Sequence, residues 1–332
     1  MIDLGYTLSS EEGRPDDLVR LARMAEETGF SYAVISDHFH PWIDRQGQSP
    51  FVWAVLGGIA HATERLTVGT GVTCPTIRVH PAIVAHAAAT CTAMMPGRFF
   101  LGVGTGENLN EHIHGDRWPP PDQRLEMLEE AIEVMRRLWE GDMITHRGRF
   151  YTVEQARIYT LPQEPPPIMV AAAKPKAAKL AGRLGDGLIA VSPDPEVVEQ
   201  FSQAGGEGKP RYGQIHVCWA ESEEAARKTA HEIWPNVAVQ GELTQELRVP
   251  QHYEQAAEMV TEDDVAEMVP CGPDPERHLD KIRAFAEAGF DHVYVHQIGA
   301  DQEGFFRFYR SEIMPRLERA ATGPQAAAPA SA

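Results

Sequence analysis

The chain has 332 residues, of which 43% are hydrophobic and 23% are charged, and its formal net charge is −18. This composition is typical of a soluble globular protein, and the acidic balance argues against nucleic acid or an anionic membrane surface as a partner. The four cysteines are far apart and form no CxxC pair, which favours a reducing cytoplasm over a disulfide scaffold. Residues 1–15 contain no signal peptide, and no apolar run is long enough to span a membrane.

Strand-like and helix-like segments alternate from the first residues onward. Residues 14–29 are typical of a helix, because Pro15 stands near the start and Gly29 at the end. Apolar runs predict strands at residues 2–8, 31–36, 66–72, 98–104, 167–173, 187–192, 213–220 and 291–297. Eight strands that alternate with helices favour a closed parallel (β/α)8 TIM barrel, of the α/β class, over an open sheet.

Two stretches interrupt this alternation. Residues 143–166 resemble a β-excursion, and residues 236–274 resemble a mostly helical insertion. Such insertions usually shape an entrance, so residues 1–320 are interpreted as one barrel domain. Residues 321–332 are rich in alanine and proline without an aromatic anchor, and we predict a disordered tail there.

In a barrel of this kind, functional side chains collect where strands end and loops begin. The stretch VISDHFHPW, residues 34–42, follows this rule: an apolar strand runs directly into Asp37, His38, His40 and Trp42. His38 is a candidate general base, because imidazole titrates near neutral pH. Asp37 could bind a ligand hydroxyl or orient the histidine, Trp42 could support an imidazolium by cation–π contact, and His40 could be a spacer.

A metal site is a second interpretation of the same residues. Two histidines that are two positions apart on an extended segment point the same way, so a metal-dependent barrel hydrolase is an alternative function. The histidines that could join such a site are His112, His114, His216 and His296. No acid or lysine at a strand end obviously completes the ligand set, and we therefore predict no metal ligand.

Three further strand ends carry candidate residues. GVGTGE, residues 102–107, lacks the third glycine of a dinucleotide-binding loop, and its glycines would let backbone approach a planar ligand while Glu107 supplies an acid. Gly71 and Val72 could form a bulge against a ring. Lys174 and Lys176 stand at a helix start, and they form the best local site for an anion in this acidic chain.

The segments SDHFHPW, TGVTCPT, FLGVGTGENLNE, AAAKP and GRLGDG together resemble the luciferase-like barrel superfamily of deazaflavin enzymes. The resemblance covers nearly the whole chain and is closest to the coenzyme F-420-dependent glucose-6-phosphate dehydrogenase subgroup. It implies a barrel that holds coenzyme F-420, an 8-hydroxy-5-deazaflavin, below a substrate at the barrel mouth. Likeness to that subgroup also suggests a homodimer.

The resemblance also implies roles for single residues. The residue corresponding to His38 takes a hydroxyl proton while hydride moves to the deazaflavin, Trp42 stabilises the charged imidazole, and Glu107 manages the proton of the reduced ring. The remaining cofactor-binding residues are expected to be Asp37, Gly71, Val72, Cys74, Asn110, Ala173, Lys174 and Lys176. The bond between Gly71 and Val72 is expected to be a cis bulge.

The chain departs from the subgroup at the sugar-phosphate site. The expected substrate-binding positions are Val191, Asp194, Arg248 and Met268. The subgroup has two lysines and an arginine at the last three of these positions. In this chain Arg248 is the one cation of the three that is kept. A carboxylate a few ångströms from a phosphate dianion would be repulsive. The sequence therefore predicts a neutral secondary alcohol or sugar rather than glucose 6-phosphate as the preferred substrate.

Two other activities remain alternatives. Relatives include reductases that use coenzyme F-420 and a branch of monooxygenases that use FMN. The set of His38, Trp42 and Glu107 favours oxidation of a CH–OH group, so the sequence predicts a dehydrogenase, with FMN as the alternative cofactor.

Overall fold

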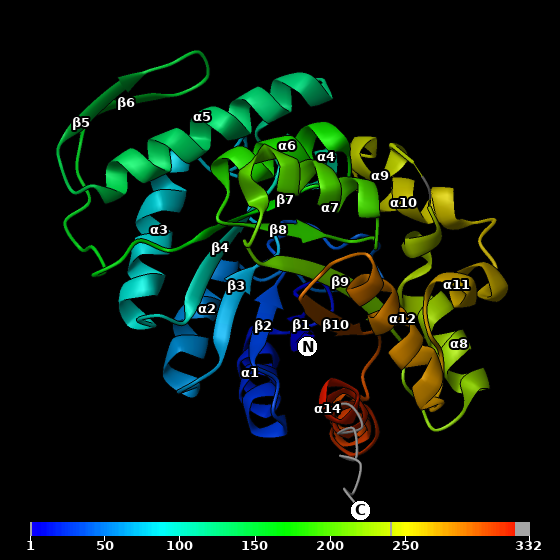
Figure 1. Ribbon diagram of the computed structural model, residues 1–332. Coiled ribbons are helices and arrows are strands. Elements are labelled where there is room, and N and C mark those ends of the chain that lie inside the picture. The colour runs from blue at the N-terminus through cyan, green and yellow to red at the C-terminus, as the bar shows by residue number, and fades with distance from the viewer. Residues whose placement is uncertain (1, 240, 323–332) are drawn as a thin grey trace, which may run out of the picture.

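The computed structural model describes residues 2–239 and 241–322, and it confirms the predicted (β/α)8 barrel (Figure 1). The barrel strands are β1 (Asp3–Leu8), β2 (Tyr32–Ile35), β3 (Thr67–Thr70), β4 (Phe99–Val103), β7 (Ile168–Ala171), β8 (Gly187–Ala190), β9 (Arg211–Val217) and β10 (His292–Gln297). They close into one sheet in the order β1, β10, β9, β8, β7, β4, β3, β2. Each strand coincides with one of the predicted apolar runs. Strand β1 pairs in parallel with both β2 and β10, which places the first strand beside the last.

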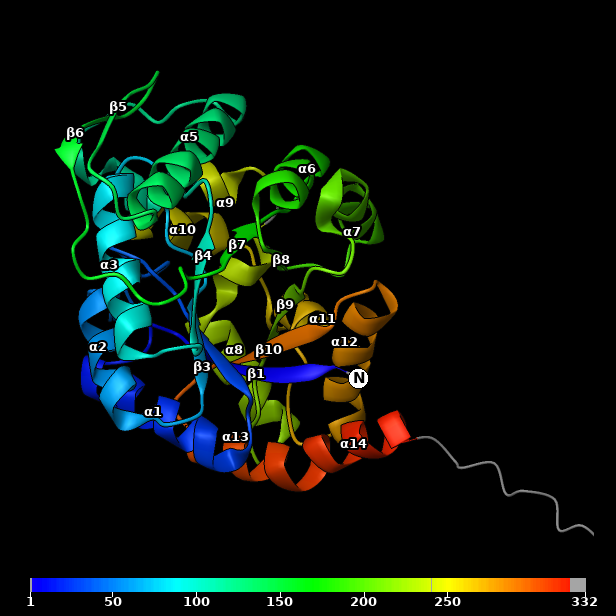
Figure 2. The same ribbon diagram turned by 60° about the vertical axis from the view of Figure 1, so that its left-hand side comes forward.

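Helices cover the outside of the barrel, as the second view of the ribbon shows (Figure 2). Seven of them begin at a proline, which fits the first turn because its missing N–H would have no partner there. These are α1 (Pro15–Thr28), α3 (Pro81–Met94), α5 (Pro121–Trp139), α6 (Pro175–Leu184), α7 (Pro195–Phe201), α10 (Pro250–Ala257) and α12 (Pro275–Glu287). The others are α2 (Val52–Ala62), α4 (Asn108–Glu111), α8 (Glu223–Ile233), α9 (Leu243–Glu246), α11 (Glu262–Met268), α13 (Gln302–Phe308) and α14 (Met314–Thr322). None of the helices in the described ranges is both long and apolar enough to cross a bilayer.

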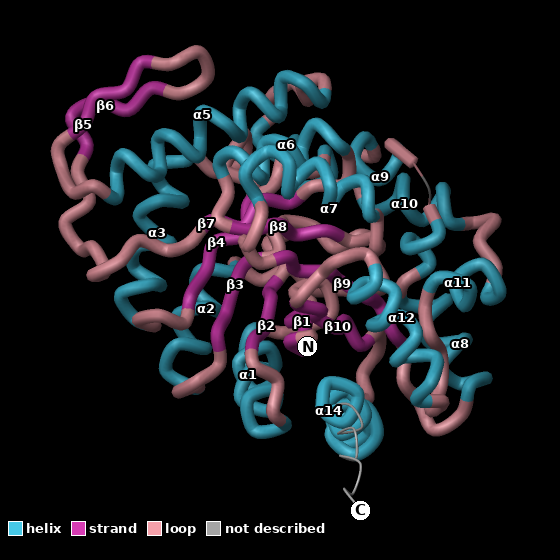
Figure 3. Tube along the Cα trace, in the orientation of Figure 1, coloured by secondary structure: helices cyan, strands magenta, loops and turns pink. Residues whose placement is uncertain are grey.

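The two interruptions of the alternation have different structures. Residues 143–166 contain an antiparallel hairpin of β5 (Ile144–Arg147) and β6 (Thr152–Ala156), which extends away from the barrel beside α5 (Figure 3). Residues 236–274 contain α9, α10 and α11. The last helix, α14, ends at Thr322, and residues 323–332 of the expected tail lie outside the described residues.

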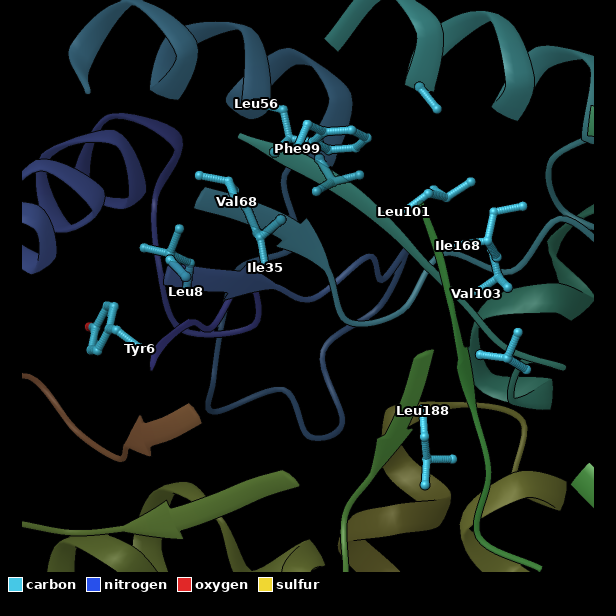
Figure 4. Packing of buried hydrophobic residues seen from close by; sticks show 14 of the residues in the cluster. Tyr6, Leu8, Ile35, Leu56, Val68, Phe99, Leu101, Val103, Ile168 and Leu188 are labelled. Atoms are coloured by element: carbon cyan, nitrogen blue, oxygen red, sulfur yellow. The ribbon is translucent and has the colours of Figure 1, made fainter. Parts of the chain in front are cut away.

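Apolar side chains form two layers. The outer layer lies between strands and helices and includes Leu8, Ile35 and Leu101 (Figure 4). The inner layer fills the barrel with Tyr32, Val34, Phe100, Met169, Ile189, Tyr212 and Tyr294. Gly69 is needed in this layer, because a Cβ atom there would overlap the Phe100 ring. The packed interior supports a cavity above it, at the carboxyl ends of the strands.

Candidate active site

A cavity of about 940 Å³ opens at the barrel mouth. This volume is at the upper end of the range for small-molecule and cofactor sites. The predicted site residues that line it are His38, Trp42, Gly71, Val72, Glu107, Ala173, Lys174, Lys176, Val191 and Met268. The predicted residues outside its lining are Asp37, Cys74, Asn110, Asp194 and Arg248. Most of the residues proposed from strand ends therefore meet at one cavity.

The segment after β2 is held in place by hydrogen bonds to its backbone. The Asn110 side-chain oxygen accepts the N–H groups of Phe39 and His40 at 2.8 and 3.2 Å. The Ser49 hydroxyl donates to the His38 carbonyl oxygen at 2.8 Å. Asn110 is buried, so it positions this segment rather than lining the cavity as a cofactor ligand.

The surroundings of His38 determine which of its ring nitrogens carries hydrogen. Its Nδ1 lies 3.2 Å from the His40 carbonyl oxygen and 3.5 Å from Oε1 of Glu11. A carbonyl and a carboxylate can only accept, so Nδ1 carries the hydrogen. The other nitrogen, Nε2, keeps its electron pair. His38 is thus arranged as a general base, and a third group orients it in the way that catalytic histidines require.

Glu11 is the acid behind this histidine. Burial acts to raise the pKa of the Glu11 carboxyl, but His38 and the Ser36 hydroxyl outweigh it and hold that pKa below its usual value. The Ser36 hydroxyl donates to Oε2 of Glu11 at 2.7 Å. A carboxylate that stays ionised in a buried place can stabilise a positive charge that forms on His38.

Trp42 packs against both the base and the late insertion. Its ring centroid lies 4.9 Å from that of His38 and 5.3 Å from that of Tyr253, which belongs to α10. The indole therefore gives an imidazolium at His38 an aromatic neighbour, in agreement with the proposed cation–π role. It also connects the insertion to the catalytic segment.

Asp37 is not among the residues that line the cavity, and its role as a ligand of the cofactor stays a prediction. Its side chain is 3% exposed and accepts hydrogen bonds from Thr73 Oγ1 at 2.7 Å and from Arg78 Nη2 at 2.9 Å. Arg78 also lies 3.6 Å from Glu111, which is fully buried. Asp37, Arg78 and Glu111 thus form a buried charge cluster beneath the rim, and Asp37 connects the loops after β2 and β3.

Burial raises the pKa of Glu111 to about 7, even though Arg78 acts to lower it. Cys74 lies in the same buried region, and burial raises the pKa of its thiol well above the usual value. A thiol that remains protonated is a poor nucleophile. Cys74 is buried and is not among the residues that line the cavity, so its role in binding the cofactor stays a prediction.

The next part of the wall is formed by the loops after β3 and β4. The peptide bond between Gly71 and Val72 is cis, as the resemblance implies. A Cβ atom at Gly104 would lie 2.7 Å from the Val72 side chain, so glycine lets these two loops approach each other. Glu107 lines the cavity beside them, and Asn110 Nδ2 lies 3.5 Å from one of its carboxylate oxygens.

The loops after β7 and β8 form another wall of the cavity, and its side chains are exposed. Ala173 and Lys174 are exposed at the start of α6, and Val191 after β8 is 62% exposed. Lys176 forms an ion pair with Asp122 at 2.9 Å, and both side chains are solvated. The two lysines at a helix start remain suitable for an anionic part of a ligand.

Two of the predicted substrate residues are not at the cavity. The Asp194 carboxylate accepts the N–H of Glu196 at 2.9 Å and caps α7, and Arg248 is exposed outside the cavity lining. The sequence segment DPE, which places proline directly after a capping acid, indicates this role for Asp194. Met268, at the end of α11, does line the cavity.

Sequence reasoning named His216 and His296 only as metal candidates and missed the polar group that they form with Glu12 on the other side of β1 from His38. Oε1 of Glu12 lies 2.8 Å from Nε2 of His296, and Nδ1 of His296 lies 2.8 Å from Nδ1 of His216. Both histidines line the cavity together with Trp234. The sequence could have indicated this group. Glu11 and Glu12 follow the first predicted strand, and His216 and His296 lie near the ends of the last two.

The histidines considered for a metal site separate into different environments. His40 Nδ1 lies 2.9 Å from the Leu109 carbonyl oxygen, and the His40 ring stacks on His112. His114 is exposed and lies 3.2 Å from the carbonyl oxygen of Arg78. In residues 2–239 and 241–322, no group of three or more histidines, cysteines and acids is arranged to hold a metal ion.

The cavity residues fit a planar tricyclic cofactor. Val72, Gly104, Ala171 and Ile189 give the wall a small and largely apolar surface, against which a flat ring can lie. Glu107 is a carboxylate in the lining, and Lys174 and Lys176 are exposed basic groups there. These groups are compatible with a deazaflavin that carries a charged side chain.

Comparisons with known proteins agree with this geometry. The luciferase-like monooxygenase family matches residues 2–292. An F-420-dependent glucose-6-phosphate dehydrogenase of Microbacterium testaceum is 35% identical over 95% of this chain and 97% of its own, and one of Nocardia farcinica is 35% identical over 95% and 98%. The solved structure of an F-420-dependent secondary alcohol dehydrogenase in complex with an F-420–acetone adduct has a TM-score of 0.87 and 31% identity, covering 94% of this chain and 98% of that one. The chain therefore belongs to the luciferase-like family.

Proposed function

We propose that the protein is a coenzyme F-420-dependent dehydrogenase that oxidises the CH–OH group of a neutral alcohol or sugar. The observation that carries this proposal is the arrangement of His38, whose Nδ1 is held by acceptors and whose Nε2 is left as a base in a cavity suited to a deazaflavin. The relatives described above support the cofactor and the type of reaction.

Coenzyme F-420, when bound, supplies a deazaflavin ring that accepts a hydride. His38 takes the hydroxyl proton of the substrate at Nε2, and a well-placed general base contributes about 10²- to 10⁴-fold to such a reaction. Glu11 and Trp42 stabilise the positive charge that this proton brings to the imidazole. Glu107 lines the cavity on the wall formed after β4. Its carboxyl group exchanges the proton that a nitrogen of the reduced ring carries.

Met268, rather than Asp194, supports a neutral substrate. Asp194 caps a helix and Arg248 lies outside the cavity lining, so neither residue supports this part of the proposal. Met268, which replaces a cation of the resembling subgroup, does line the cavity. A basic side chain, Lys281 of α12, also lines the cavity, which is why a phosphorylated sugar belongs in the substrate screen.

A substrate and cofactor screen tests the proposal. Purified protein would be titrated with F-420 and with FMN while ring fluorescence is followed, and F-420 reduction would then be measured with isopropanol, glucose and glucose 6-phosphate. We expect F-420 to bind and to be reduced by a neutral compound. Tight binding of FMN without any effect of F-420 would contradict the cofactor, and a clear preference for glucose 6-phosphate would contradict the substrate class.

A further inference from the structure

The hydrogen-bonded chain of Glu12, His296 and His216 ends at a free ring nitrogen in the cavity. His296 and His216 are opposite each other on β10 and β9, and their Nδ1 atoms are 2.8 Å apart. His296 is 1% exposed, so its two ring nitrogens are both used within the chain. Nε2 of His216 has no hydrogen-bond partner in the described part of the chain, and His216 lines the cavity.

The contacts of Glu12 determine the direction of these hydrogen bonds. Its Oε2 accepts the N–H of Gly299 at 2.9 Å, and its Oε1 faces Nε2 of His296, which therefore carries hydrogen. Nδ1 of a neutral His296 is then an acceptor, so His216 donates its own Nδ1–H to it. Burial lowers the pKa of His216 to about 3, so the His216 ring is uncharged. Nε2 of His216 is thus an acceptor when His296 is also uncharged.

We propose that His216 is a second substrate-binding residue, which accepts a hydrogen bond from a second hydroxyl of a neutral diol or sugar. This inference rests on the proposed function, in which the first hydroxyl faces His38. A methyl ether or a phosphate dianion has no hydrogen to donate, so either group would place an acceptor against an acceptor, which is unfavourable in a partly buried site. Glu12 and His296 are positioning residues that fix the orientation of His216.

A series of diols tests this arrangement. Each diol carries a secondary and a primary hydroxyl, with increasing chain length between them, and each is compared with the ether in which the primary oxygen is methylated. We expect one diol to have a kcat/KM about tenfold above that of its ether, which corresponds to one net hydrogen bond to an acceptor in the site. A ratio of one or less for every diol would overturn the inference, because a His216 that donates an N–H is satisfied equally by a hydroxyl oxygen and by an ether oxygen.

Isopropanol separates this inference from the proposed function, because it has a single hydroxyl. If isopropanol and the diols reduce F-420 equally well, without any preference for a diol over its ether, the inference is wrong and the dehydrogenase remains. If none of these compounds reduces F-420, both proposals are overturned. A preference for glucose 6-phosphate that disappears in Lys281→Met would also contradict the inference, because the second group recognised would be an anion.

The substitution Glu12→Gln should abolish the preference for the diol. The Gly299 N–H still needs an acceptor, so the amide oxygen would face Gly299 and the amide NH₂ would face His296. His296 would then donate from Nδ1, and His216 would present an N–H to the cavity. We expect the ratio of kcat/KM for diol over ether to fall to about one in this variant, because a hydroxyl and an ether oxygen both accept from an N–H.

The matched control is Glu11→Gln, one residue away. It removes the charge beside His38 but leaves the chain through His296 intact, so the ratio should stay near the wild-type value even if kcat falls. Because the preference is a ratio measured on one enzyme, a general loss of activity cancels. Should Glu12→Gln fail to fold, His216→Leu should bring the ratio to about one. A wild-type ratio in His216→Leu would refute the proposal.

Discussion

The two halves of the cavity rim differ in how firmly their side chains are held. On the half formed after β1 to β4, Glu11 and Asp37 are buried, and their carboxylates bond to hydroxyl groups or to Arg78. On the half formed after β7 and β8, Lys174 and Val191 are exposed. The first half suits chemistry, which requires fixed geometry, and the second suits the binding of parts of a ligand that extend into solvent.

The largest effect is expected when the general base, His38, is replaced on the half formed after β1 to β4. We expect His38→Asn to lower kcat by about 10²- to 10⁴-fold, because the group that accepts the hydroxyl proton is lost. The affinity for F-420, measured by fluorescence titration, should change less than about twofold. The matched control is His40→Asn, since His40 bonds to the Leu109 carbonyl and does not line the cavity. Equal losses of kcat in both variants would count against His38 as the base.

A second prediction concerns the stability of the same half. Glu111 has a folded-state pKa of about 7 against the usual glutamate value of 4.5, so between these values the folded protein keeps a proton that the unfolded chain releases. Stability is therefore expected to fall as pH rises through this range, by roughly 3 kcal/mol from this group. Urea unfolding at pH 5 and pH 8 should show this loss in the wild type and not in Glu111→Gln.

The control for that measurement is Glu133→Gln, which changes an exposed acid on α5. This variant should keep the wild-type dependence on pH. If Glu111→Gln also keeps it, another group causes the loss, and the buried cluster with Arg78 is not the pH-sensitive element of the rim.

A smaller effect is expected on the exposed half. The double variant Lys174→Ala and Lys176→Ala should weaken the binding of F-420 by about fivefold at low salt, because solvated charges contribute little and are screened. A deazaflavin that lacks the phosphate and the acidic tail should bind equally to both proteins in the same titration. If the double variant bound both compounds more weakly by the same factor, these lysines would act on the binding of the ring.

The smallest effect is expected for Asp194→Ala. Loss of the helix cap should reduce the free energy of unfolding by about 1 kcal/mol, and Asp194→Asn should restore most of it. The KM for the preferred substrate should change less than twofold, because the carboxylate does not line the cavity. A large change in KM would return Asp194 to the substrate site.

The strands and the positions of the loops could be predicted from the sequence because they depend on local patterns. Apolar runs of six to eight residues between helices, several of which have proline at their start, are sufficient to indicate the barrel. The rule that chemistry collects at strand ends then identified His38, Trp42 and Glu107, all of which line the cavity.

The direction of a side chain at a strand end could not be predicted in the same way. Asp37 and His38 are neighbours in the sequence, but Asp37 turns into the protein because Arg78, from a distant loop, meets it there. The loop that contains Arg248 offers no periodic pattern, so its distance from the cavity was not visible. His216 and His296 become a pair only because β9 and β10 are adjacent and in register.

Strand β1 lies between β2 and β10, and the two glutamates that follow it reach one histidine on each side. Glu11 serves the base after β2, and Glu12 serves the chain that begins at His296 on β10. One added or deleted residue between Leu8 and Glu11 would misplace both acids at once. Changes in substrate preference in this protein should therefore arise by substitution along the histidine chain, whereas changes in loop length after β1 would abolish catalysis and recognition together.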